Sequence, residues 1–122
     1  MNIKMIKRNV LPVIVFMVVS TIPALSMSES GKIDLLLSRI EKSNLIFIRN
    51  GAEYTSKRAR EHLEYKYSRA GDRIQTARQF IKFIATRSYL TGIPYYVRYP
   101  DGRKIKTSNW LLKQLKQIEK SE

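Results

Sequence analysis

The sequence predicts an α+β fold with about four helices and two short β-hairpins, in the order helix, hairpin, helix, helix, hairpin, helix. Three observations predict it: apolar residues recur at helical spacing in four segments, turn residues divide two pairs of β-prone runs, and no linker or low-complexity tract interrupts the 122 residues. Two hairpins can pair their strands into one small antiparallel sheet with helices on one face.

A helix, a hairpin and a second helix come first in this order. The first helix is predicted by four apolar residues at helical spacing: Ile33, Leu36, Leu37 and Ile40. The β-prone run 45–49 is followed by Asn50-Gly51, a tight-turn dipeptide because both residues accept positive φ, and then by a short return strand. Thr55 suits an N-cap, and Gly71 stops the second helix.

The third helix has the clearest start signal, because Thr76 and Gln79 have the spacing of a capping box. Four large apolar side chains follow, and burying each of them contributes ~1.5 to 3 kcal/mol: Phe80, Ile81, Phe83 and Ile84. We therefore expect this helix to form the centre of the core and to fade over residues 88–92.

The second hairpin and the last helix complete the chain. Pro94 begins an extended run at 95–99, the turn residues 100–102 follow, and residues 103–106 return. Thr107 or Ser108 is then expected to cap a helix that carries Trp110, Leu111, Leu115 and Ile118.

The N-terminal segment has the three parts of a secretory signal peptide. Lys4, Lys7 and Arg8 precede the apolar run 10–19, which is well short of the ~20 residues that cross a bilayer as a helix. Small residues favour cleavage between Ser26 and Met27, with cleavage two residues later as the alternative. We therefore expect a cleavable signal peptide at 1–26 and a single globular domain at 27–122, without a transmembrane helix.

The composition of residues 27–122 limits the function further. Three of the 23 Lys and Arg precede residue 27, so the domain keeps 20 of them with all 10 acids and a net charge of +10. Such a surface attracts polyanions. The absence of cysteine excludes disulfides, thiolate metal sites and cysteine nucleophiles. Neither a cofactor motif nor a metal-binding motif occurs, and we expect no cofactor and no metal.

A series of short motifs resembles a family of small exported bacterial proteins of unknown function. The series is Phe47-Ile48-Arg49-Asn50-Gly51, His62-Leu63, Thr76-Ala77 with Phe80-Ile81, Ala85-Thr86-Arg87-Ser88, Gly92-Ile93-Pro94-Tyr95, and Asp101-Gly102 with Trp110-Leu111. The resemblance covers nearly all of residues 27–122. It implies a Gram-negative envelope setting, and hence a periplasmic location, but no reaction, ligand or partner.

Catalytic candidates are few. His62 is the only histidine, and a catalytic dyad would require it beside a nucleophile such as Ser88 with an orienting carboxylate. Glu53 and Asp101, one at each hairpin, could form a carboxylate pair. A small hydrolase or lyase that uses His62 with Glu53 and Asp101 is therefore one hypothesis. A lone helical histidine and acids in turns more often serve packing and turn geometry.

The preferred hypothesis is a non-enzymatic interaction domain that binds through the basic, tyrosine-rich side of its second hairpin. Arg98, Arg103, Lys104 and Lys106 lie in that hairpin beside Tyr95. Cations interleaved with tyrosine can hold an anionic envelope polymer, a lipid headgroup or a protein partner. Because the protein is predicted to be exported, we do not expect nucleic acid to be its ligand. Solvated helix and hairpin faces explain the same clusters without a ligand.

Lys66 and Arg87 complete the predicted binding residues. At 100° per residue, Lys66 shares a face of the second helix with Ala59, Leu63 and Ala70, and Arg87 falls on the apolar face of the third helix. A cation on a core face must reach solvent, a carboxylate or carbonyl oxygens. The two side chains either tie helices to hairpins in this way or converge on a recessed anion site near Tyr54 or Tyr95.

Overall fold

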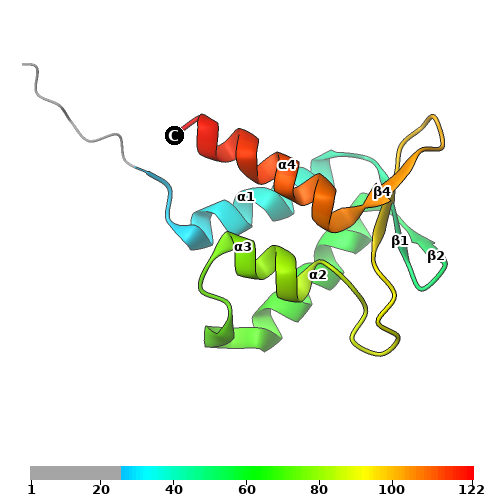
Figure 1. The fold of residues 1–122 in the computed structure, drawn as a ribbon, viewed down its shortest axis with the longest axis horizontal. Helices are drawn as coiled ribbons and strands as arrows, with labels where there is room; N and C mark the ends of the chain where they lie inside the picture. Colours follow the sequence, from blue (N-terminus) through cyan, green and yellow to red (C-terminus); the bar gives the residue numbers. More distant parts are fainter. Residues whose placement is uncertain (1–25) are drawn as a thin grey trace, which may run out of the picture.

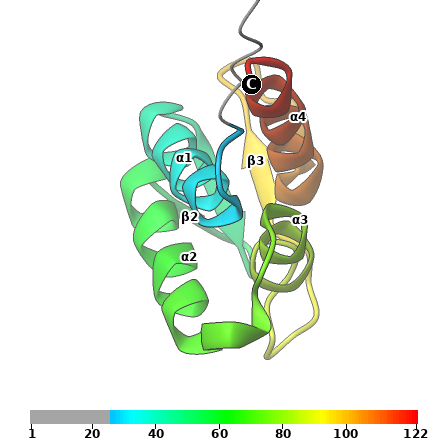
Figure 2. The same cartoon turned by 90° about the vertical axis from the view of Figure 1, so that its left-hand side faces the viewer.

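A computed structural model describes residues 26–122. The predicted signal peptide, apart from Ser26, lies outside the described residues. The described chain forms a four-stranded antiparallel sheet with helices packed on one face, and the view from the helix side shows them in front of the strands (Figures 1 and 2). The predicted α+β class is confirmed.

The first half of the chain follows the predicted boundaries closely. Helix α1 (Glu29–Lys42) buries the four apolar residues predicted for it, and strands β1 (Ile46–Arg49) and β2 (Ala52–Tyr54) form a hairpin. Asn50 and Gly51 turn this hairpin with φ of 51° and 77°. Helix α2 (Ser56–Ala70) begins at the Thr55 N-cap, whose side chain accepts a hydrogen bond from the Arg58 N–H, and ends at Gly71. A short 3-10 turn, η1 (Gly71–Arg73), follows it.

The two hairpins join into one sheet, as the sequence predicted. Strands β3 (Tyr96–Arg98) and β4 (Lys104–Lys106) form the second hairpin, and the strand order is β2-β1-β3-β4. Strands β1 and β3 pair antiparallel at the centre, where Phe47 lies opposite Val97.

The two faces of the sheet differ in polarity because side chains alternate along each strand. Phe47 and Val97 point into the helix layer and are buried. Arg49, two residues after Phe47, points to the same inner face. The alternate residues of each strand point to the outer face, where Arg98 of β3 lies opposite Lys104 of β4. This alternation decides which cations can meet a helix.

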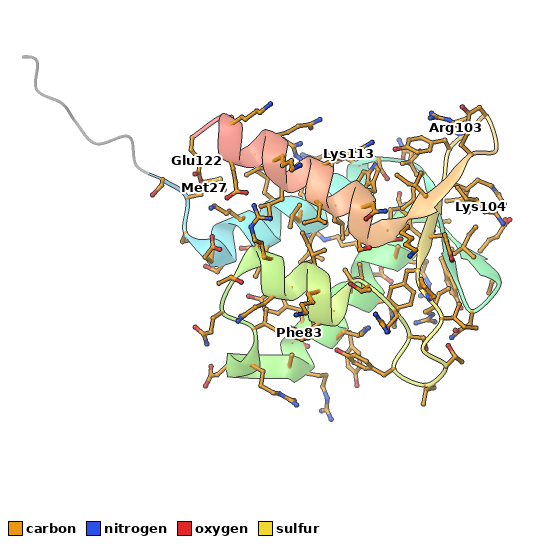
Figure 3. All side chains as sticks on the ribbon, in the orientation of Figure 1. Met27, Phe83, Arg103, Lys104, Lys113 and Glu122 are labelled. Atoms are coloured by element: carbon orange, nitrogen blue, oxygen red, sulfur yellow. The ribbon has the colours of Figure 1, made fainter. Side chains whose placement is uncertain are left out.

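The third helix differs from the prediction. The capping box of Thr76 and Gln79 is present, but α3 (Ala77–Gln79) passes at once into a π-helix, η2 (Phe80–Ile84), in which the Ala85 N–H donates to the Phe80 carbonyl. The wider turn changes which residues face the core. Phe80, Ile81 and Ile84 are buried, whereas Phe83 is 49% exposed, so its predicted burial was wrong. Figure 3 shows Phe83 on the side of this segment away from α4.

The helical segment also ends earlier than the predicted fade over residues 88–92. Regular helix stops at Ile84, and Arg87 instead forms an isolated antiparallel bridge with Pro94. The Arg87 side chain is exposed. Its predicted place on the apolar face of the third helix was therefore wrong, because that helix does not extend to residue 87.

Helix α4 (Thr107–Lys120) buries the residues predicted for it, and the Trp110 ring meets Phe47 edge-on with centroids 6.1 Å apart. The predicted capping by Thr107 or Ser108 was wrong, because the N-cap residue is Lys106 and no side chain caps this helix. Thr107 lies inside the first turn and is 1% exposed. Within residues 26–122, every helix is too short or too polar to cross a membrane.

Candidate functional site

A cavity of about 300 Å³ lies between the β1–β2 hairpin, helix α2 and the start of α4. We call it the Arg49 cavity. Its apolar lining comes from Phe47, Ile48, Ala59 and Leu63. The polar side chains in its lining are Arg49, Tyr54, Arg58, Glu61, His62, Tyr65, Tyr95 and Thr107. The cavity therefore combines an apolar part with a set of hydrogen-bonding groups, as small-ligand sites do.

Arg49 and His62 are in direct contact inside the cavity. Arg49 Nη1 lies 2.6 Å from Nδ1 and 2.8 Å from Nε2 of His62, and Arg49 Nη2 donates to the Tyr54 hydroxyl over 3.1 Å. A guanidinium can only donate, so a ring nitrogen of His62 must accept. The Arg49 guanidinium also lies 4.7 Å from the centroid of the Tyr54 ring.

The electrostatics of the cavity follow from this contact. Burial, followed by the nearby charges of Arg49 and Lys66, lowers the pKa of His62 to about 4. The imidazole is therefore neutral at pH 7, as its role of acceptor from Arg49 requires. Within residues 26–122, no carboxylate lies within salt-bridge distance of Arg49. The positive charge of Arg49 is thus not balanced by an acid.

Lys66 lies behind the cavity on the predicted core face of α2 and is 8% exposed. Its ammonium donates to the carbonyls of Ile84, over 2.7 Å, and Arg87, over 3.3 Å, and to the Tyr95 hydroxyl over 3.0 Å. Carbonyls at the end of a helical segment attract a cation. Burial, followed by the charge of Arg49, lowers the pKa of Lys66 to about 8. Carbonyl oxygens therefore satisfy this cation, which was one of the partners predicted for it.

Hydrogen-bond donors dominate the remaining polar groups. The Tyr95 hydroxyl accepts from Lys66 and lies 3.4 Å from Nε2 of His62. Thr107 lines the cavity, and its Oγ1 is buried without a hydrogen-bond partner. A buried hydroxyl without a partner calls for an explanation, and a bound group in the cavity would supply one.

The predicted catalytic residues do not come together. Glu53 lies on the outer face of the sheet and pairs with Arg98, and Asp101 accepts from the Arg103 side chain over 2.7 Å in the β3–β4 turn. Ser88 accepts from Asn50 Nδ2 over 3.3 Å. Within residues 26–122, the hydrogen bonds of His62 involve Arg49 and Tyr95, and none involves a carboxylate.

The predicted binding residues divide into two groups. Tyr95 lines the cavity and accepts from Lys66 behind it, whereas four cations lie at the outer hairpin: Arg98, Arg103, Lys104 and Lys106. Figure 3 shows Arg103 and Lys104 at the end of the described domain opposite Met27 and Glu122. Arg87 belongs to neither group, so Lys66 and Arg87 do not converge on one site as side chains.

Arg49 was not among the predicted site residues. The run 45–49 predicts a strand and His62 is the only histidine, but neither observation alone predicts their contact. The sequence does contain a pattern that predicts the position of Arg49. It lies two residues after Phe47, and this spacing puts both side chains on the core face of a strand. As with Lys66, a cation predicted on a core face is a candidate for a special environment. Within the described residues, no three acidic or histidine side chains gather as a metal site would require.

The fold and the cavity define a small α+β domain with a donor-rich, cationic pocket beside its sheet. Residues 27–119 match the family described as "Family of unknown function (DUF5329)", and the chain belongs to that family. It is similar to "Uncharacterized protein YfeK" of Salmonella typhimurium (strain LT2), with 37% identity over 79 residues, 62% of this chain and 66% of the relative. No solved structure matches it. The predicted family of unknown function is confirmed.

Proposed function

We propose that this protein is an exported, non-enzymatic binding domain of the periplasm that holds an anionic group of an envelope component in the Arg49 cavity. The group is a carboxylate or a phosphate, because both accept the paired donors of a guanidinium. The observation that carries the proposal is the charge of Arg49, which faces the neutral His62 and the Tyr54 hydroxyl in place of an acid.

The donor set of the cavity supports this proposal. Arg49 uses part of its five donors on His62 and Tyr54, and Thr107 Oγ1 lacks a partner. An anion would accept from these groups and would balance the charge. Phe47 and Leu63 would contact the apolar body that carries the anionic group.

The same geometry argues against the hydrolase or lyase hypothesis. General acid–base catalysis requires a group that gains and loses a proton near the working pH. His62 has a pKa of about 4 and contacts a cation, while Glu53 and Asp101 are paired with arginines elsewhere. Glu61 lines the cavity, but it pairs with Arg58 at 3.5 Å.

Titration with inorganic phosphate and with acetate tests the proposal. Both anions should perturb the ring resonances of His62 and Tyr95. Arg49→Gln should weaken the binding roughly tenfold or more, because a hydrogen bond to a charged group contributes about 1.5–3 kcal/mol. Arg103→Gln is the matched control, since it removes the same charge from an exposed turn.

A second comparison separates the cavity from the outer hairpin. Replacing Arg103, Lys104 and Lys106 together by Gln is compared with replacing the exposed α4 residues Lys113, Lys116 and Lys120. If the cavity holds the anion, both triple variants bind phosphate and acetate with similar, slightly reduced affinity. The proposal fails if the hairpin triple variant loses binding while Arg49→Gln keeps it, because the anion then binds outside the cavity.

A further inference from the structure

Five large apolar side chains are exposed within a single stretch of the chain, residues 65–93. They are Tyr65, Phe83, Tyr89, Leu90 and Ile93, and Leu90 is 96% exposed. Of the large apolar side chains exposed in the described part of the chain, Met27 is the one that lies outside this stretch. A small soluble domain rarely exposes apolar residues in such a group without a partner.

Tyr65, Phe83 and Tyr89 border one groove of about 660 Å³ between α2 and the π-helix. We call this groove and the adjoining loop tip at residues 89–93 the aromatic face. Tyr65 also lines the Arg49 cavity, so the two hollows are neighbours. The π-helix produces this face, because its wide turn directs Phe83 away from the core.

The aromatic face is held in place and is not a frayed loop. The Tyr89 hydroxyl donates to the Phe83 carbonyl over 2.8 Å, and the ring of Tyr89 lies 3.9 Å from the ammonium of Lys66. The backbone closes the loop through Ser88 N to Ile93 O at 3.0 Å and Gly92 N to Ser88 O at 2.9 Å. Leu90 therefore projects from a fixed turn.

The charge around the aromatic face is predominantly positive. Residues 65–93 contain six cations and one acid, Asp72. Arg69 and Arg73 border the groove with Lys66, and Lys82 adjoins Phe83 with its ammonium 5.3 Å from the ring centroid. Arg87 is exposed on the loop beside Tyr89. Cations that surround exposed aromatic and aliphatic side chains match the phosphates and the interfacial layer of an anionic bilayer.

We propose that the aromatic face docks on the surface of an anionic phospholipid bilayer. Leu90 and Phe83 enter the interfacial layer, the tyrosines lie at the level of the headgroups, and Lys82, Arg87 and the two groove arginines contact lipid phosphates. Charge complementarity favours a lipid surface over an acidic protein, because the cations are spread along residues 66–87 and do not form one compact pocket. This surface is separate from the anion site proposed in the Arg49 cavity.

Co-sedimentation with vesicles tests the docking. Vesicles of equal parts phosphatidylglycerol and phosphatidylcholine are compared with vesicles of phosphatidylcholine alone. The wild-type protein should bind the anionic vesicles and should be released by salt. Leu90→Ser should reduce the vesicle partition coefficient roughly tenfold, whereas Leu90→Met should keep it, because an apolar side chain remains. Leu90 is almost fully exposed, so neither variant disturbs the core.

The charged part of the face has its own matched pair of variants. Lys82→Gln with Arg87→Gln should weaken binding to anionic vesicles more than Lys113→Gln with Lys116→Gln, which removes the same charge from α4. Every variant carries the same N-terminus as the wild-type protein, so that segment contributes equally to all measurements.

Three results would overturn the docking proposal. They are equal loss from both charge pairs, equal partition of Leu90→Ser and the wild-type protein, and Leu90-dependent self-association without vesicle binding. The last result would assign the face to a second copy of this chain. Leu90 does not line the Arg49 cavity, so Leu90→Ser should bind inorganic phosphate as the wild-type protein does. Loss of phosphate binding and loss of vesicle binding are therefore distinguishable failures.

Discussion

The guanidinium of Arg49 lies within 2.8 Å of both ring nitrogens of His62, and this contact ties strand β1 to helix α2. Both residues are basic in their side-chain chemistry, yet they can lie together because burial keeps His62 neutral. The contact brings a cation without an acid partner to the lining of a cavity. The anion site proposed above depends on this relationship.

Acidification should destabilise the protein through His62. The pKa of His62 is lowered from 6.5 to about 4 in the folded protein by burial and by Arg49 and Lys66. Between these two pH values the unfolded chain binds a proton at His62 and the folded protein does not, so stability falls as the pH falls through this window. We expect a loss of about 1 kcal/mol between pH 7 and pH 5, allowing for the partial exposure of the ring.

Urea unfolding at both pH values measures this effect in the wild-type protein and in His62→Gln. The variant lacks the titrating ring and should lose less stability on acidification, while its carboxylates titrate as before. Identical losses in the two proteins would mean that His62 ionises equally in the folded and unfolded states.

Lys66→Met should destabilise the protein by about 2 kcal/mol, because the Ile84 carbonyl and the Tyr95 hydroxyl lose a buried donor. Methionine retains most of the length and apolar contact of the lysine stem. Lys113→Met, at an exposed position of α4, is the control and should be close to neutral. Equal free energies of unfolding for the two variants would show that the Lys66 ammonium contributes nothing to the end of the π-helix.

Lys66 also predicts a rise in stability at alkaline pH. Its pKa is about 8 in the folded protein against 10.5 ordinarily. Between pH 8 and about pH 10.5 the unfolded chain holds the proton that the folded protein has lost, so the free energy of unfolding rises with pH there. Arg49, Tyr89 and Tyr95 surround this group. The rise should be smaller in Lys66→Met, and a Lys66→Met curve parallel to the wild-type curve would contradict the lowered pKa.

Arg87→Leu should change the free energy of unfolding by less than about 0.5 kcal/mol, because the side chain is exposed and outside any helix. Arg60→Leu should cost more, about 0.5–1 kcal/mol, because Arg60 pairs with Glu41 at 2.5 Å and with Glu64 at 3.5 Å. The predicted place of Arg87 on the apolar face of the third helix implied the opposite order. Thermal melts of the two variants decide between them.

Export is tested at the N-terminus. Mass spectrometry of the protein isolated from the cell envelope should give a chain that begins at Met27, or at Glu29 if the alternative site is cleaved. The reason is the charged segment, apolar run and small residues of the first 26 positions. Recovery of the intact chain from Met1 in the soluble fraction would contradict cleavage.

The sequence by itself determined the order of the elements and most of their ends. Asn50-Gly51 fixed the first hairpin turn, because both residues adopt positive φ at little cost, and Thr55 and Thr76 fixed two helix starts through side-chain hydrogen bonds. These are local effects, which depend on neighbours along the chain. The helical spacing that placed Lys66 on the core face of α2 is local in the same sense.

The tertiary structure alone decided which polar groups meet. His62 and Arg49 are 13 residues apart, and their contact requires β1 to lie beside α2 with its core face turned toward the helix. The π-helix is also not predicted by local sequence pattern. Its widened turn exposes Phe83 and ends the helix before Arg87. The Lys66 ammonium from α2 then donates to the free carbonyls of Ile84 and Arg87. Helical periodicity assumes a constant rotation per residue, and a single π-turn shifts every later side chain to another face.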